Sequence, residues 1–206
     1  MSETGSVEEK HDQEEETSGF ETAKYFVFDF LKVFLIAVAI IIPIRWFLFQ
    51  PFVVTGDSML PTFQDGNYLI VDEFSYHLRD PGRGEVVVLR FPRDPSQFFI
   101  KRIVGLPGER IVIENTAIII YNTEHPDGMV LQESYLPKEA VTYGNVNKVL
   151  ASDEFFVLGD NRLSSSDSRL WGALPRKNVV GRVYLRLLPI EELKLFSATF
   201  FAPLLH

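Results

Sequence analysis

The stretch that decides the fold class is FFIKRIVGLPGERIVIENTAIIIY, residues 98–121. It contains three short runs of β-branched and aromatic residues, which are separated by Gly-Leu-Pro-Gly-Glu and by Asn-Thr. Runs of this composition, bounded by Gly, Pro and Asn, are typical of β-strands joined by tight turns. The stretch therefore predicts strands over residues 98–104, 110–114 and 117–121.

Further strand-like runs lie on both sides of this stretch, at residues 68–71, 85–91, 154–159 and 179–188. No amphipathic helical segment of comparable length separates them, which disfavours a parallel sheet built from βαβ units. We expect a mainly β fold, in which residues 50–113 and 153–190 form an antiparallel, partly closed β-sheet or barrel. The turn-rich residues 114–152 are predicted to form a small inserted subdomain.

The N-terminal part of the chain has a different character. Residues 1–24 are polar and acid-rich, which predicts a disordered tail. Residues 25–49 are mostly apolar and, at about 1.5 Å of rise per residue, are enough for one transmembrane helix. A helix buried in a protein core is the alternative. No small-x-small cleavage site follows the apolar run, so we expect an uncleaved signal anchor.

The distribution of basic residues predicts the orientation of this anchor. Lys24 and Lys32 precede the apolar core and Arg45 follows it, which favours a single-pass protein of the plasma membrane with a cytoplasmic N-terminus and an extracytoplasmic β domain. Residues 191–206 are apolar but too short to span a membrane. They either lie on the membrane surface or pack against the core.

The composition excludes several classes of function. A net charge of −8 has the wrong sign for a nucleic-acid-binding protein. The absence of cysteine rules out disulfides, thiol nucleophiles and thiolate metal sites. The four histidines lack metal-binding spacing, so we expect neither a metal nor another cofactor. Catalysis would have to use hydroxyl, carboxylate, amine or backbone groups.

Three segments concentrate unusual residues: TGDSMLPT at 55–62, FFIKRIVGLPGE at 98–109 and VLGDNRLSSSDSR at 157–169. In a strand, Lys101 shares a face with Phe99 and Ile103. Burial beside such residues lowers the pKa of the lysine, and an amine that is neutral near about pH 7 to 8 is a competent general base. Each segment also has an ordinary explanation: a Gly-Asp-Ser turn, a solvent-facing lysine and a solvated loop.

In this order, the three segments resemble the nucleophile box, the lysine box and a downstream structural box of the bacterial type I signal peptidases (leader peptidases), the S26 serine protease family. RGEVVVLRFP, residues 83–92, resembles the strand between the first two boxes. The resemblance runs from about Arg45 to Leu188 and includes the N-terminal anchor. It implies a membrane-bound serine endopeptidase, taken as a monomer at the lipid bilayer, that removes signal peptides from exported preproteins by cutting after small residues (Ala-x-Ala).

The resemblance also assigns roles to residues. Ser58 is the nucleophile and Lys101 its general base, in a Ser-Lys dyad with an acyl-enzyme intermediate. Ser165 matches a serine that orients the lysine amine, and Gly56 and Asp57 adjoin the nucleophile where the oxyanion is bound. Ion pairs in the framework of the site are expected from Asp160, Arg162, Asp167 and Arg169. Positions that line the substrate pocket correspond to Phe52, Val54, Met59, Phe63, Phe99 and Ile100.

The sequence departs from the family pattern at two positions. Gly56 stands where Gram-negative members have a serine whose hydroxyl helps the oxyanion hole. Backbone N–H groups, chiefly that of Ser58, would replace it here, as in Gram-positive members. Leu163 stands where the family often has Asp or Asn, which calls the charge network of that loop into question.

Three other interpretations stay open at this point. Self-cleaving regulators of the LexA-like kind share the Ser-Lys logic, but they are soluble and carry a DNA-binding domain. A membrane-anchored extracytoplasmic β domain that only binds partners would have a similar composition. A serine–histidine mechanism would use His77 or His125, although neither lies in a recognisable motif.

Overall fold

The computed structural model describes residues 24–41 and 49–196, and the chain divides into two compact units, Met1–Trp46 and Phe47–His206. In the first unit, residues 24–41 form a helix with mostly exposed apolar side chains. No helix among the described residues is long and apolar enough to cross a membrane. The predicted tail up to residue 23, the part of the predicted anchor at 42–48 and the C-terminal residues 197–206 lie outside the described residues.

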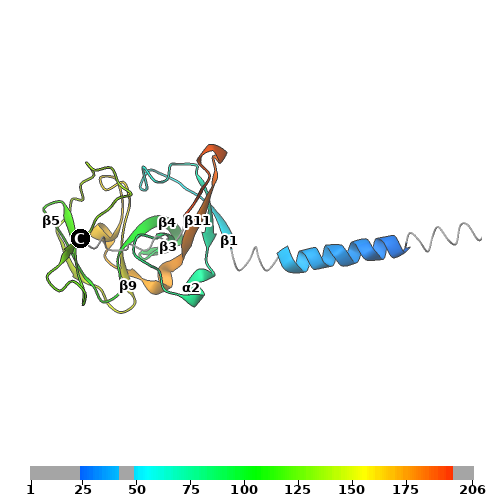
Figure 1. The fold of residues 1–206 in the computed structure, drawn as a ribbon, viewed down its shortest axis with the longest axis horizontal. Coiled ribbons are helices and arrows are strands. Elements are labelled where there is room, and N and C mark those ends of the chain that lie inside the picture. The colour runs from blue at the N-terminus through cyan, green and yellow to red at the C-terminus, as the bar shows by residue number, and fades with distance from the viewer. Residues whose placement is uncertain (1–23, 42–48, 197–206) are drawn as a thin grey trace, which may run out of the picture. The chain divides into compact units, whose positions relative to one another are not determined.

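The second unit is built around a sheet of eight strands in the order β1-β2-β11-β3-β4-β9-β10, with β12 paired to β11 (Figure 1). Every neighbouring pair is antiparallel, which confirms the mainly β, antiparallel fold. The path has two ends, β1 and β10, so the described strands form an open sheet and the predicted closure is absent. The strands are β1 Phe49–Val53, β2 Tyr68–Asp72, β3 Val86–Phe91, β4 Asp94–Gly105, β9 Glu154–Leu158, β10 Leu174–Pro175, β11 Val179–Leu188 and β12 Lys194–Leu195.

A second sheet has four strands in the order β7-β6-β5-β8, and three of them, β6, β7 and β8, lie within the predicted insertion of residues 114–152. It starts at Arg110, before the predicted boundary at residue 114, because β5 pairs with both β6 and β8. The strands are β5 Arg110–Glu114, β6 Ala117–Tyr121, β7 Met129–Val130 and β8 Val146–Val149.

Two features of the larger sheet were outside the sequence-based expectation. β4 begins at Asp94 rather than at Phe98, because its first residues continue the hairpin with β3, where Phe91 pairs with Asp94. β1 was not among the predicted strands, and its first residue, Phe49, fell at the end of the predicted anchor, yet β1 pairs with β2 along its whole length. The short helical elements are α2 Ser75–Leu78, α3 Ser168–Trp171, η1 Arg176–Asn178 and η2 Ile190–Glu192.

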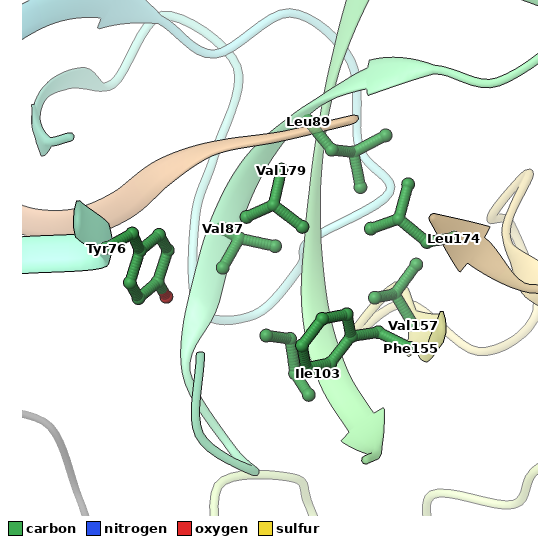
Figure 2. Packing of buried hydrophobic residues seen from close by; sticks show 8 residues of the cluster. All are labelled: Tyr76, Val87, Leu89, Ile103, Phe155, Val157, Leu174 and Val179. Atoms are coloured by element: carbon green, nitrogen blue, oxygen red, sulfur yellow. The ribbon is translucent and has the colours of Figure 1, made fainter. Parts of the chain in front are cut away.

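The apolar side chains of the second unit pack in three clusters. One cluster joins β3, β4 and β9 to the segments around them (Figure 2), with the members Tyr76, Val87, Leu89, Ile103, Phe155, Val157, Leu174 and Val179. Val87 and Leu89 share a face of β3 because side chains alternate along a strand, and Ile103 lies on the same face of the sheet because Lys101, two residues before it, pairs with Val87. The face of β4 that carries Lys101 is therefore packed against this core, which holds the lysine backbone rigidly.

Candidate active site

Ser58 lies in the loop that joins β1 to β2, and a glycine shapes the turn before it. Gly56 has a φ of +86°, a left-handed conformation that favours glycine. Its N–H donates to Asp65 Oδ1 at 2.7 Å, which closes the loop from the other side. The Ser58 side chain is half-buried. The turn thus presents the hydroxyl at a fixed corner.

Asn161, which the sequence-based reasoning missed, holds the two residues that end this turn. Its backbone N–H donates to the carbonyl of Ser58 at 3.1 Å, and its Nδ2 donates to the carbonyl of Asp57 at 3.1 Å. Within the described residues, the N–H of Ser58 has no hydrogen-bond acceptor. The only sequence signal for Asn161 is its place between Asp160 and Arg162 in the polar loop.

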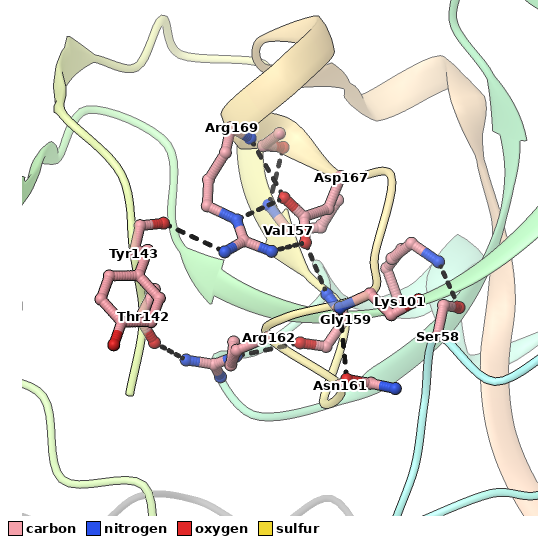
Figure 3. Close-up of polar contacts among 12 residues, drawn as sticks. Ser58, Lys101, Thr142, Tyr143, Val157, Gly159, Asn161, Arg162, Asp167 and Arg169 are labelled. Carbon is pink, nitrogen blue, oxygen red and sulfur yellow. Dashed lines mark hydrogen bonds and ion pairs between the residues drawn. The ribbon is translucent and has the colours of Figure 1, made fainter. Parts of the chain in front are cut away.

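Lys101 meets Ser58 from strand β4. Its Nζ donates to Ser58 Oγ at 2.8 Å and to the carbonyl of Ile100 at 2.8 Å (Figure 3). The residue is only 3% exposed, and Nζ lies 5.4 Å from the ring centroid of Phe99. Burial lowers the pKa of Lys101 to about 8, although the negative charges of Asp167 and Asp160 act in the opposite direction. A large fraction of this amine is therefore neutral slightly above neutral pH.

Two buried ion pairs frame the lysine. Asp160 accepts two hydrogen bonds from Arg102, at 2.8 and 2.5 Å, and a third from the hydroxyl of Thr62 at 2.5 Å. Asp167 accepts two hydrogen bonds from the guanidinium of Arg169, both at 2.8 Å, and one each from the backbone N–H groups of Arg169 at 3.2 Å and Gly159 at 3.1 Å. Arg102 was not among the predicted residues; its place next to Lys101, on the opposite side of the strand, was the available signal.

Arg162, for which no partner was predicted, forms its ion pair with Glu133 of the insertion. It donates to both carboxylate oxygens of Glu133, at 2.5 and 2.6 Å, and to the hydroxyl of Thr142 at 2.5 Å. Its Nε donates to the carbonyl of Gly159 at 2.9 Å. Leu163 is 76% exposed, so these ion pairs form without a carboxylate at that position.

Ser165 lies beside the site without the expected hydrogen bond to the lysine. Its Oγ is buried and has no hydrogen-bond partner in the part of the chain that the structure describes. A Cβ atom placed on Gly159 would lie 2.1 Å from this oxygen, so the two residues are in tight contact.

A hollow of about 260 Å³ opens next to Ser58 and Lys101. Four of the six residues predicted for the substrate pocket line it: Phe52, Val54, Phe99 and Ile100. The other two, Met59 and Phe63, are placed elsewhere: both are fully buried in a core cluster, because the loop after Ser58 turns inward. The wall also includes Leu69, Val88 and the 44% exposed Phe98, which the sequence-based reasoning missed.

The alternative chemistries find no support at this site. Neither His77 nor His125, the histidines of the described residues, forms a hydrogen bond with Ser58. The described residues contain no group of three or more His, Asp or Glu side chains that could hold a metal ion.

The chain resembles known proteins over most of its length. The family model of signal peptidase, peptidase S26, matches residues 27–188. Probable signal peptidase I-1 of Synechocystis sp. is 34% identical over 186 residues, which cover 86% of this chain and 91% of the relative. Signal peptidase I of Leptolyngbya laminosa is 35% identical, with 79% and 80% covered, and that of Bacillus caldolyticus is 34% identical, with 76% and 89% covered. The crystal structure of a signal peptidase I from Enterococcus faecalis V583 is 26% identical, has a TM-score of 0.43 and aligns with 51% of this chain and 97% of that one.

Proposed function

We propose a Ser-Lys mechanism on the premise that this chain belongs to the signal peptidase family of S26 peptidases, as a type I signal peptidase and therefore a serine endopeptidase. The enzyme removes signal peptides from exported preproteins, with Ser58 as nucleophile and Lys101 as general base. The observation that carries this proposal is the 2.8 Å distance between Ser58 Oγ and the buried Nζ of Lys101.

The chemistry requires the neutral form of the lysine. In that form, the Ser58 hydroxyl donates its proton toward the lone pair of Nζ and Oγ attacks the scissile carbonyl carbon, which forms a C–O bond. The resulting ammonium of Lys101 then protonates the leaving amine as the C–N bond breaks. Water attacks the Ser58 ester, gives one proton to Lys101 and releases the signal peptide carboxylate, and the serine hydroxyl is restored.

The oxyanion of the tetrahedral intermediate is bound by backbone groups. The N–H of Ser58 is available, because it has no acceptor within the described residues. Gly56 contributes no side-chain donor, and Asp65 already occupies its N–H. The Ser58 N–H is therefore the principal donor in the turn formed by Gly56, Asp57 and Ser58.

Ser165 orients the lysine during the reaction. Its hydroxyl is buried without a partner among the described residues, and a buried free hydroxyl costs stability unless another state uses it. We assign that state to protonated Lys101, whose third N–H needs an acceptor once two are bound to Ser58 and Ile100.

The hollow beside the dyad selects small residues at the cleavage site. Its wall is largely apolar, and Phe52, Phe99 and Ile100 limit the space available to each side chain of an extended substrate. The substrate binds in an extended form along the edge strand β1, where backbone groups provide hydrogen bonds.

Residues 25–49 anchor the enzyme in the plasma membrane, with the N-terminus in the cytoplasm and the catalytic domain outside. The described helical part of this segment, residues 25–41, supports the proposal with its exposed apolar side chains. Resistance of the full-length protein to extraction from membranes by alkaline carbonate would test it, and release into the soluble fraction would contradict it.

The mechanism is tested by cleavage of a preprotein with an Ala-x-Ala site by the full-length chain in detergent. We expect Ser58→Ala and Lys101→Met to abolish formation of the mature fragment while the circular dichroism spectrum is retained. His77→Ala and His125→Ala are the controls and should cleave normally. Full activity of either dyad variant would overturn the mechanism. Binding of the preprotein without any cleavage by the unmodified chain would favour a non-catalytic binding domain.

A further inference from the structure

A second cavity, of about 530 Å³, lies away from the hollow beside Ser58. Lys101 lines the smaller hollow, whereas the next residue, Arg102, lines the larger cavity. The two linings have no residue in common, so the larger cavity is separate from the hollow beside the dyad. The reaction described above makes no use of this larger cavity.

Four basic side chains from three strands converge on its walls: Arg102 of β4, Arg182 and Arg186 of β11, and Lys194 of β12. The hydrogen bonds of Arg102 to Asp160 and to the carbonyl of Gly84 use all three of its side-chain nitrogens.

Protein acceptors hold the two β11 arginines in place without using all of their donors. Arg182 donates from Nε to Asp72 at 3.0 Å, and neither of its terminal nitrogens has an acceptor within residues 24–41 and 49–196. Arg186 donates from Nε to the carbonyl of Glu192 and from Nη1 to the carbonyl of Thr62, both at 2.9 Å. Its Nη2 has no acceptor among the described residues. The guanidinium groups are thus oriented in advance and still have N–H groups for a ligand.

The carboxylates on the wall do not cancel this preference for an anion. Glu85 accepts hydrogen bonds from Tyr76, Gly82 and both terminal nitrogens of Arg79, so other groups already compensate its charge. Glu192 lies 3.2 Å from Arg186 in an ion pair whose glutamate side chain is 36% exposed, which makes the pair weak and easily opened. Lys194 has no carboxylate partner among the described residues, and its Nζ lies over the Phe196 ring.

We propose that this cavity binds a phosphate ester, whose phosphate oxygens accept hydrogen bonds from Arg182, Arg186 and Lys194. A phosphate group offers several oxygens to arginine and lysine donors that approach from different strands. The cavity is larger than a bare phosphate ion needs, and its apolar wall, made by Val183, Leu195 and Phe196, suits the organic part of the ester. This inference does not depend on the peptidase mechanism.

Two kinds of molecule carry such a phosphate ester: soluble phosphate esters and phospholipids, through their head groups. Three apolar residues of the hairpin formed by β11 and β12 are exposed beside the cavity: Ile190 (71% exposed), Leu193 (57%) and Leu195 (62%). They offer an apolar surface to the acyl chains of a lipid. A matched series of ligands separates the two sources: glycerol 3-phosphate, dihexanoylphosphatidic acid, which carries the same phosphate with two acyl chains, and dihexanoylglycerol, which lacks the phosphate.

Isothermal titration calorimetry of the full-length chain in a nonionic detergent, with these three probes, tests the proposal. We expect both phosphate esters to bind and dihexanoylglycerol not to bind; tighter binding of the phosphatidic acid would identify a lipid as the natural source. Arg182→Gln combined with Arg186→Gln should weaken binding at least about tenfold, because it removes charged hydrogen bonds. Arg110→Gln combined with Lys148→Gln removes the same charge from the second sheet and should leave the affinity for both phosphate esters unchanged.

Lys194→Gln provides an independent variant, since Lys194 is exposed and its replacement leaves the packing intact. We expect it to weaken phosphate-ester binding several-fold. If the double arginine variant does not fold, the affinity of Lys194→Gln tests whether the cavity binds the phosphate. The proposal is overturned if neither phosphate ester binds, if dihexanoylglycerol binds as well as the phosphatidic acid, or if the folded arginine and lysine variants retain full affinity.

Discussion

Gly159 and Ser58 approach each other so closely that a Cβ atom added to the glycine would lie 2.4 Å from the backbone carbonyl oxygen of Ser58. The same atom would lie 2.1 Å from Oγ of Ser165. The backbone of the loop that follows β9 therefore packs directly against the nucleophile turn. Since Gly159 also donates its N–H to Asp167, it cannot move away without breaking that contact.

Gly159→Ala should therefore displace the nucleophile. We expect kcat/KM for preprotein cleavage to fall by more than about tenfold and stability by about 1–3 kcal/mol, because a methyl group in a filled space forces the backbone apart. Gly82→Ala is the matched control, since its Cβ would meet Glu85 only at 3.7 Å, an ordinary contact distance. Equal activity of Gly159→Ala and the parent enzyme would show that the contact has no role in positioning Ser58.

The pH dependence of cleavage should report the ionisation of Lys101. Burial lowers its pKa to about 8, and only the neutral amine can accept the proton of Ser58. We expect kcat/KM to rise with pH along a limb with an apparent pKa of about 8 and to level off above it. Steady-state cleavage of a preprotein peptide between pH 6 and 10, run in overlapping buffers, would measure this limb. A profile that is flat from pH 6 to 8 would contradict a lysine base with this pKa.

Lys101 also makes the stability of the protein depend on pH. The folded protein loses this proton near pH 8 and the unfolded chain near 10.5, so below pH 8 both states are protonated and folding buries an ammonium at a cost of about 3 kcal/mol. From pH 8 to 10.5 the unfolded state binds more protons, so this cost is progressively relieved as the pH rises. Lys101→Met, although inactive, should be more stable than the parent at pH 7, with an advantage that shrinks above pH 8.

Urea unfolding of the two proteins at pH 7, 8, 9 and 10 would measure this advantage. Lys148→Met is the control, because the Lys148 side chain is 44% exposed and its replacement should give no comparable change with pH. A stability difference between Lys101→Met and the parent that stays constant across this range would argue against a buried ammonium at position 101.

The strands could be predicted from the sequence because their apolar runs end at residues that form turns, as at Gly105 and at Asn115. The prediction that the Lys101 side chain shares a face with Phe99 and Ile103 followed from the alternation of side chains along a strand. The pairing of Arg162 could not be predicted, since its partner Glu133 lies 29 residues away in a segment without periodic pattern. Met59 and Phe63 show the same limit, because an apolar residue after a turn can face either a pocket or the core, and only the path of the loop decides between them.

Asn161→Asp should slow the chemical step with little change in substrate binding. The substitution removes the Nδ2 donor that holds the carbonyl of Asp57 at 3.1 Å, while the backbone bond to Ser58 can persist. The loss of one hydrogen bond, about 0.5–1.5 kcal/mol, and the added repulsion between the new carboxylate oxygen and the carbonyl oxygen of Asp57 correspond to a fall in kcat of at least about two- to tenfold with KM unchanged. Asn147→Asp on the exposed part of β8 is the control. A change confined to KM would mean that Asn161 acts on the substrate and does not position Ser58.

The insertion should stabilise the catalytic loop through Glu133. Its carboxylate is the ion-pair partner of Arg162, whose side chain is only 2% exposed, and it also accepts a hydrogen bond from Tyr135. Glu133→Ala leaves a buried guanidinium without its counter-charge, so we expect a loss of about 3–5 kcal/mol in stability. Cleavage should fall as well, because Arg162 fixes the carbonyl of Gly159, the residue that packs against Ser58. Glu139→Ala, an exposed substitution in the same segment, is the control for charge, and chemical denaturation with parallel cleavage assays provides both readouts. If Glu133→Ala were as stable and as active as Glu139→Ala, the second sheet would be an appendage that does not support the site.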